Sequence, residues 1–113
     1  MKALAVIPSI GRSPLLPDLV ALLVDEYIDV LLIDNLPGAE PSELVTAQAC
    51  PGVRVMHRPA WRGIYRQWNV GLRLGWQKNV PVLVLNDDIV LPPWAPTTMV
   101  NVLADSNEWS LLG

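Results

Sequence analysis

Several features are scarce or missing in this chain of 113 residues, and each absence excludes a class of protein. The single cysteine, Cys50, excludes an intramolecular disulfide and favours a reducing compartment, so we expect a cytoplasmic protein. No apolar run approaches the roughly 18 residues that cross a bilayer. The apolar stretch at the N-terminus is too short for a signal-peptide core because Pro8 and Gly11 interrupt it. We therefore expect no membrane span.

Positive charge is also scarce. Eight Lys and Arg residues stand against eleven Asp and Glu residues, which gives a formal net charge of −3. No segment forms a basic face, so we expect no nucleic-acid partner. The residues are 51% hydrophobic and only 17% charged. This composition suits one small domain whose sheet is covered by helices on both faces, and it leaves room for a buried partner surface.

Apolar runs and helical patterns alternate along the chain in the order β-α-β-α-β-α-β-α-β. We predict strands at 3–8, 29–33, 53–57, 81–85 and 109–112, and helices at 14–26, 41–49, 64–78 and 92–105. Such alternation favours a mainly parallel sheet with right-handed crossovers. Polar and apolar residues alternate at 53–57, which predicts an edge strand, whereas the apolar run at 81–85 predicts a strand buried on both faces.

The helical segments have predicted caps and inner faces. Ser13 is the predicted N-cap of the first helix, with Pro14 at its first helical position. Gly71 and Gly75 interrupt the helix at 64–78, and because each costs about 1 kcal/mol relative to Ala, they predict close packing against the sheet. The predicted inner faces are Ile64, Tyr65, Trp68, Leu72 and Trp76 in this helix, and Ala95, Met99, Val102 and Leu103 in the last helix.

Three polar residues, Asn86, Asp87 and Asp88, follow the strand predicted at 81–85. Two adjacent carboxylates repel each other, and burying either one unpaired is costly. A divalent cation removes both objections, and Mg²⁺ or Mn²⁺ prefers such oxygen ligands together with water and substrate phosphates. We therefore predict a metal–diphosphate site. The alternative is a turn in which these side chains bind the local backbone.

Two further strands are predicted to end in polar residues, at Pro8-Ser9 and at Asp34-Asn35. The carboxyl ends of parallel strands meet at one edge of a sheet, which is where ligands bind in open α/β folds. A ligand shared by all of these strand ends explains them better than three unrelated turns.

Segments 6–12, 32–35, 62–71 and 85–88 follow one another at natural spacings, and Pro92-Pro93-Trp94 comes after the last of them. This ordered set, which covers nearly all of the chain, resembles the family-two glycosyltransferases with the GT-A fold. The first segment is similar to the opening strand and loop of that family. Residues 85–88, Leu-Asn-Asp-Asp, are similar to its metal-binding DxD-type motif.

The resemblance implies a three-layer α/β/α sandwich with a mainly parallel sheet, which is the GT-A (Rossmann-like) nucleotide-diphospho-sugar transferase fold. Residues 1–113 would form one nucleotide-sugar-binding domain. It would be the donor-binding portion of a metal-dependent, inverting glycosyltransferase that uses a nucleoside diphosphate sugar and an unknown acceptor. The family's catalytic domain is normally longer and carries its acceptor half after the metal strand. We therefore expect a truncated fold, with the general base beyond Gly113.

The same resemblance implies roles for individual residues. The implied nucleotide-sugar-binding residues are Pro8, Ser9, Gly11, Arg12, Asp34, Arg62, Gly63, Asn86 and Asp87. Asp34 would accept a hydrogen bond from the base, and its alternative role is a strand-end cap or turn former. Asp88 would bind Mn²⁺ or Mg²⁺, which acts as a Lewis acid toward the diphosphate. Arg58 and Arg66 compete with Arg62 for the contact with the base or the phosphates.

Other interpretations remain. The chain could be a non-catalytic nucleotide-binding or oligomeric assembly module, with a second copy or a partner chain completing its site. A sugar-phosphate nucleotidyltransferase fits less well because no Gly-x-Gly-x-x-Arg loop follows the first predicted strand. A response-regulator phosphoacceptor domain fits less well because the acid pair follows the fourth predicted strand. We assign no role to His57, and Trp61 is the tryptophan best placed to stack on a base or sugar.

Overall fold

The computed structural model describes residues 2–59 and 64–104, in which strands and helices alternate along the chain. The strands are β1 (Leu4–Ser9), β2 (Asp29–Asp34), β3 (Val53–His57) and β4 (Val82–Val84). The helices are α1 (Leu16–Asp25), α2 (Glu43–Thr46), α3 (Ile64–Lys78) and α4 (Ala95–Ala104). In this part of the chain the strands form one parallel sheet in the order β3-β2-β1-β4.

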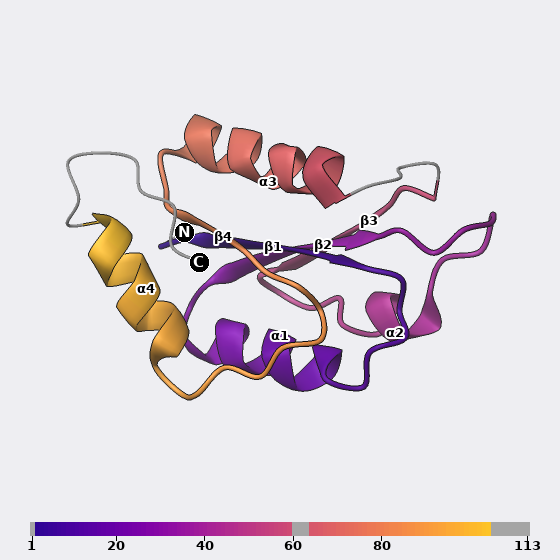
Figure 1. Cartoon of the computed structure of the whole chain (residues 1–113), viewed down its shortest axis with the longest axis horizontal. Coiled ribbons are helices and arrows are strands. Elements are labelled where there is room, and N and C mark those ends of the chain that lie inside the picture. Colours follow the sequence, from indigo (N-terminus) through magenta and orange to yellow (C-terminus); the bar gives the residue numbers. More distant parts are fainter. Residues whose placement is uncertain (1, 60–63, 105–113) are drawn as a thin grey trace.

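Helices cover both faces of the sheet, with α3 on one face and α1, α2 and α4 on the other (Figure 1). Successive side chains of a strand point to opposite faces, so β1 supplies both cores. Leu4 and Val6 pack in the cluster beneath α3, whereas Ala5 and Ile7 pack in the cluster shared with α1. The predicted three-layer α/β/α arrangement with a parallel sheet is confirmed as a Rossmann-like α/β fold.

The two outer strands correct one prediction and confirm another. β3 lies at an edge, as its alternating pattern predicted. The prediction that residues 81–85 form a strand buried on both faces is wrong for the described residues, in which β4 lies at the edge of the sheet and pairs only with β1. Val82 and Val84 are accordingly half-buried rather than buried. The strand predicted at 109–112 lies outside the described residues.

α3 has the predicted bounds, whereas α1, α2 and α4 begin later than the sequence predicted. Leu15, rather than Ser13, occupies the N-cap position of α1. Ser13 instead closes a tight turn, since its hydroxyl accepts the N–H of Leu15 at 3.2 Å and its carbonyl accepts the N–H of Leu16 at 3.3 Å. α4 begins at Ala95, after the two prolines predicted to open it, and α2 is shorter than predicted at both ends.

α3 confirms the role of its glycines but only part of its predicted inner face. A Cβ atom on Gly71 would lie 2.5 Å from the Cβ of Val6, and one on Gly75 would collide with the side chain of Val82. These two positions therefore allow the helix to lie directly on the sheet. Tyr65, Leu72 and Trp76 of the predicted face are 75%, 43% and 68% exposed, whereas Trp68 is half-buried and packs against the cluster beneath α3.

α4 is held by the buried side chain of Glu26, which follows the end of α1. The carboxylate accepts the N–H of Trp94 at 2.9 Å, the N–H of Thr97 at 3.0 Å and the hydroxyl of Thr97. These are the free N–H groups that a helix N-terminus presents, so Glu26 caps α4 from a distant part of the chain. Within α4, Pro96 and Val100 are buried, whereas Val102, predicted to point inward, is 51% exposed.

Within residues 2–59 and 64–104, none of the helices combines the length and apolar character needed to cross a bilayer.

Candidate functional site

The carboxyl ends of β1, β2 and β4 meet at one hollow, which we call the carboxyl-edge hollow. Its volume is about 370 Å³. It is lined by Pro8, Ile10, Asn35, Gln67, Asn86, Asp87 and Asp88. The structure thus brings together the strand ends that the sequence predicted to share a ligand.

Pro8 explains why the sheet opens at this point. In the parallel ladder between β1 and β4, the carbonyl of Val6 accepts the N–H of Leu85 at 3.1 Å. The next bond toward the carboxyl edge would need an N–H on residue 8, which proline lacks. The pairing of the two strands ends at Val6 and Val84, and the segment that carries Asn86 to Asp88 lines the hollow instead of continuing the sheet.

Ser9 links the end of β1 to the acidic segment that follows β4. Its hydroxyl donates to Oδ2 of Asp87 at 2.7 Å, and its oxygen accepts the N–H of Gly11 at 2.9 Å. Ser9 is only 4% exposed, so the side chain that holds Asp87 in place is itself buried. Of the predicted nucleotide-binding residues, Ser9 thus positions Asp87 and does not itself line the hollow.

Gly11 is required by the shape of the loop that follows β1. Its φ of +75° lies in the left-handed region that favours glycine. A Cβ at this position would collide with the side chain of Ser42, the N-cap of α2. Gly11 therefore lets the β1–α1 loop pack against the start of α2. Arg12, which follows it, is exposed and does not line the hollow.

Asp34 supports this edge from inside the protein. Its side chain is fully buried, and its oxygens accept the N–H of Leu36 at 3.1 Å and the N–H of Ser42 at 2.7 Å. Nδ1 of His57 lies 3.0 Å from the same carboxylate. Because a carboxylate only accepts, Nδ1 carries the proton. This geometry favours the turn-forming role of Asp34 over direct contact with a base, and it gives His57 a structural role.

Two residues of the hollow were not predicted as site residues: Gln67 and Ile10. Gln67 lies on the sheet-facing side of α3, is 3% exposed, and donates from Nε2 to Oδ1 of Asn35 at 3.2 Å. Asn35 in turn donates from Nδ2 to the carbonyl of Arg58 at 2.7 Å. The sequence did contain a signal for Gln67. It is a polar residue one helical turn before Gly71, and it therefore lies on the side of the helix that faces the sheet. The 41% exposure of Ile10 depends on the loop and had no signal in the sequence.

The acidic segment presents donors of the kind that a hard divalent cation prefers. Asn86 and Asp88 are exposed at the hollow, and Asp87 is half-buried beside Ser9. Among the described residues no group of three His, Cys, Asp or Glu side chains gathers closely enough to hold a metal. Mg²⁺ is commonly bound by one or two carboxylates, with water and phosphate oxygens completing its shell. The donor set therefore fits a metal that arrives with a phosphate ligand.

We found no family model, no curated protein and no solved structure that matches this chain.

The electrostatics of the hollow limit what it can bind. The charged residues that line it in the described part of the chain, Asp87 and Asp88, are both acidic. Two carboxylates repel a phosphate unless a cation lies between them and it. Such a cation is either a metal or an arginine. The predicted Arg62, with Gly63, lies outside the described residues, as does Trp61. The hollow itself is therefore suited to a divalent cation with an anionic ligand.

Proposed function

We propose that this chain is the donor-binding portion of a metal-dependent glycosyltransferase, which binds a nucleoside diphosphate sugar in the carboxyl-edge hollow. One observation carries the proposal: the ends of the parallel strands β1, β2 and β4 place Pro8, Asn35 and the pair Asp87 and Asp88 around the same hollow. The carboxyl edge of a parallel sheet is where nucleotides bind in open α/β folds. The ordered motifs that resemble the GT-A glycosyltransferases add the reaction class.

The roles of the acidic residues follow from their exposure. Asp88 is exposed and would contribute a carboxylate to the metal, whereas Asp87, fixed by Ser9, would lie nearer the ribose or a water outside the metal's first shell. A divalent metal bound there would supply positive charge, which offsets the negative charge that develops on the leaving nucleoside diphosphate. Asn86 lines the hollow without adding charge. Asn35 takes the contact with the base that the sequence assigned to Asp34, because Asn35 lines the hollow and Asp34 is buried.

Transfer of the sugar with inversion also needs a general base that takes a proton from the acceptor hydroxyl. We assign no described residue to that role.

The test is thermal melting of the full chain with UDP, GDP, dTDP or CDP, each with and without Mn²⁺. A nucleotide at ~100 times its dissociation constant stabilises the folded state by ~2.7 kcal/mol. For a domain of this size the midpoint then rises by several degrees. We expect one nucleotide to give this shift only with Mn²⁺, and Asp88→Asn to abolish it. The matched control is Asp25→Asn, an exposed carboxylate on α1 that does not line the hollow.

Two results would contradict the proposal. One is a cooperative melt that no nucleotide shifts with or without the metal. The other is a shift that survives Asp88→Asn unchanged.

An assembly module is the second candidate, and the exposed side chains of Tyr65, Leu72 and Trp76 on α3 favour it. Large apolar groups gathered on one exposed surface mark interaction sites. This alternative predicts a stable oligomer in analytical ultracentrifugation and no effect of nucleotides on the melting midpoint. Trp76→Ser would dissociate that oligomer, whereas it would leave metal-dependent nucleotide binding unchanged.

A further inference from the structure

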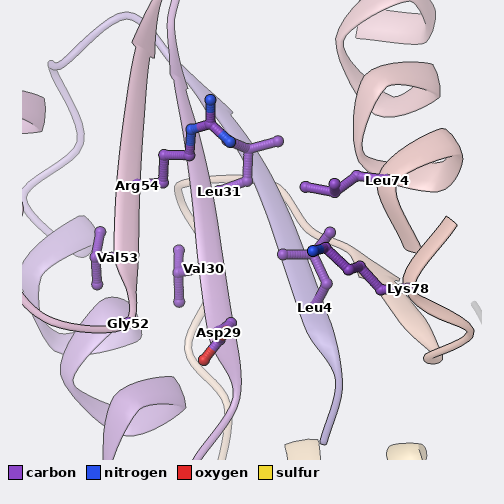
Figure 2. A pocket seen from close by; sticks show the side chains of 9 residues that line it. All are labelled: Leu4, Asp29, Val30, Leu31, Gly52, Val53, Arg54, Leu74 and Lys78. Carbon is purple, nitrogen blue, oxygen red and sulfur yellow. The ribbon is translucent and has the colours of Figure 1, made fainter. Parts of the chain in front are cut away.

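A second hollow lies at the opposite edge of the sheet from the carboxyl-edge hollow, and we call it the amino-edge hollow. It is formed where β1, β2 and β3 begin and where α3 ends, and its volume is about 310 Å³ (Figure 2). This size is at the lower limit of cavities that hold small molecules. None of its lining residues belongs to the site proposed above.

The inner surface of the amino-edge hollow is apolar. Leu4 and Leu31 form its floor, and both are almost fully buried. Leu74, half-buried on α3, forms one wall. These leucines have no polar atom on their side chains, so the floor and this wall favour the apolar part of a ligand.

Two cations enter the same hollow from opposite sides. Figure 2 shows Arg54 reaching from β3 toward α3, and the ammonium of Lys78 turned back from α3 toward Leu4. Neither side chain makes a hydrogen bond or ion pair with the described part of the chain. The one carboxylate among the lining residues, Asp29, lies beside Gly52, at the beginning of β2. Two of the eight basic residues of an acidic protein are thus gathered over an apolar floor.

We propose that the amino-edge hollow binds a small amphipathic anion, with a carboxylate or phosphate-monoester head and a short apolar chain. The guanidinium of Arg54 and the ammonium of Lys78 bind the head through charge-assisted hydrogen bonds. The leucines cover the chain. Arg54 and Lys78 are both exposed at the rim of the hollow. Charge complementarity selects this ligand, since an uncharged apolar molecule gains nothing from the two cations and a cationic one is repelled by them. Lys78 also offsets the negative end of the α3 dipole. This role needs no ligand, so the experiment must distinguish it from ligand binding.

The experiment is an NMR titration of the ¹⁵N-labelled full chain with octanoate and with octyl phosphate. Octanol and octylammonium test the need for a negative head, and acetate and inorganic phosphate test the need for the apolar chain. We expect at least one of the two amphipathic anions to bind saturably and to shift the amides of Leu31, Arg54 and Leu74. The other four molecules should bind at least tenfold more weakly.

Variants locate the head. Arg54→Gln and Lys78→Gln should each weaken binding by about tenfold, which is the effect of losing one charge-assisted hydrogen bond. Arg73→Gln is the matched control, because Arg73 is exposed on α3 and does not line the hollow. It should leave binding unchanged, and all three variants should keep the wild-type amide spectrum away from the substitution.

Three outcomes would overturn the proposal. In the first, neither amphipathic anion binds saturably. In the second, octanol binds as tightly as the anions, which makes the hollow an unspecific apolar surface. In the third, Arg73→Gln weakens binding as much as Arg54→Gln, which makes the effect one of net charge. Because the hollow is separate from the nucleotide site, each of these results leaves the melting experiment with nucleotides unaffected.

Discussion

Asp34 and Glu26 are buried carboxylates, and each accepts hydrogen bonds from groups that lie far away in the sequence. Asp34 holds together the end of β2, the start of α2 and the end of β3 through Ser42 and His57. Glu26 ties the end of α1 to the start of α4. A buried carboxylate is tolerated only when such partners satisfy it. These two carboxylates therefore stabilise the packing of the layers around the sheet, and they do not belong to the candidate site.

Glu26 makes the stability of the fold dependent on pH. Burial raises the pKa of Glu26, but the hydrogen bonds from the Thr97 side chain and from the N–H groups of Trp94 and Thr97, with the charge of Lys2, outweigh it. The net pKa is lowered from its ordinary value of 4.5. A carboxylate with a lowered pKa stabilises the folded state above its ordinary pKa, and this contribution is lost as the pH falls below that value.

We predict that Glu26→Gln destabilises the protein near neutral pH by about 1 kcal/mol, the usual cost of losing a helix cap. The difference from wild type should shrink as the pH falls below 4.5, because Glu26 then binds a proton in the unfolded chain and, below its lowered pKa, in the folded protein too. Denaturant unfolding at a series of pH values measures it. Glu40→Gln, at an exposed position, is the control and should match wild type throughout. A difference that stays constant or grows in acid would contradict the assignment.

The close packing of α3 on the sheet depends on the absence of a side chain at two positions of the helix. Gly71 and Gly75 lie where any side chain would meet Val6 or Val82. A glycine inside a helix costs about 1 kcal/mol relative to alanine when nothing else intervenes. Here the close approach to the sheet compensates for that cost, because it brings the backbone of the helix against the core.

We predict that Gly71→Ala destabilises the protein by roughly 1–3 kcal/mol, the usual cost of overpacking, although helix propensity alone favours alanine. Adding Val6→Ala removes both γ-methyl groups, which are two of the three colliding atoms, and leaves the Cβ of residue 6. The double variant should therefore be more stable than the sum of the two single changes predicts. Urea unfolding of all four proteins in this cycle gives the coupling energy. Asn69→Ala, exposed on the same helix, is the control for propensity. Strict additivity would contradict the contact.

At the scale of the whole molecule, the sheet differs strongly between its middle and its β4 edge. β1 and β2 pair over six residues each, and both have neighbours on either side. β4 pairs over three residues with β1 alone in the described part of the chain. In a parallel ladder successive N–H groups of a strand point to opposite sides. The N–H of Leu85 therefore donates to the carbonyl of Val6, whereas that of Val84 points away from β1, to an edge that no described strand covers.

We predict that native-state hydrogen exchange alternates along this edge. The amide of Leu85 should be protected, whereas that of Val84, one residue earlier, should exchange rapidly. The amides of Leu32 and Ile33 in β2 should be among the slowest and serve as internal references. Equal protection of Val84 and Leu85 would show that β4 is paired on both sides in solution, and it would contradict the prediction that β4 is an edge of the whole sheet.

The sequence by itself determined the elements and the place where they converge. Apolar runs bounded by Pro and Gly predicted the described strands and helices, and polar strand ends predicted the carboxyl-edge hollow. Both signals are local, because side-chain periodicity and turn chemistry act over a few residues. Chemistry at Asn86, Asp87 and Asp88 could be proposed for the same reason.

Only the tertiary structure decided which groups are engaged and which surfaces are left open. It made β4 an edge of the described sheet and turned Tyr65 and Trp76 of α3 into solvent. It also engaged Asp34 with Ser42 and His57. It also showed the amino-edge hollow, whose Arg54 and Lys78 lie on separate elements. Each of these outcomes depends on contacts between residues far apart in the chain. The surroundings of each side chain are determined by residues far away in the sequence, and local sequence patterns do not predict which residues these are.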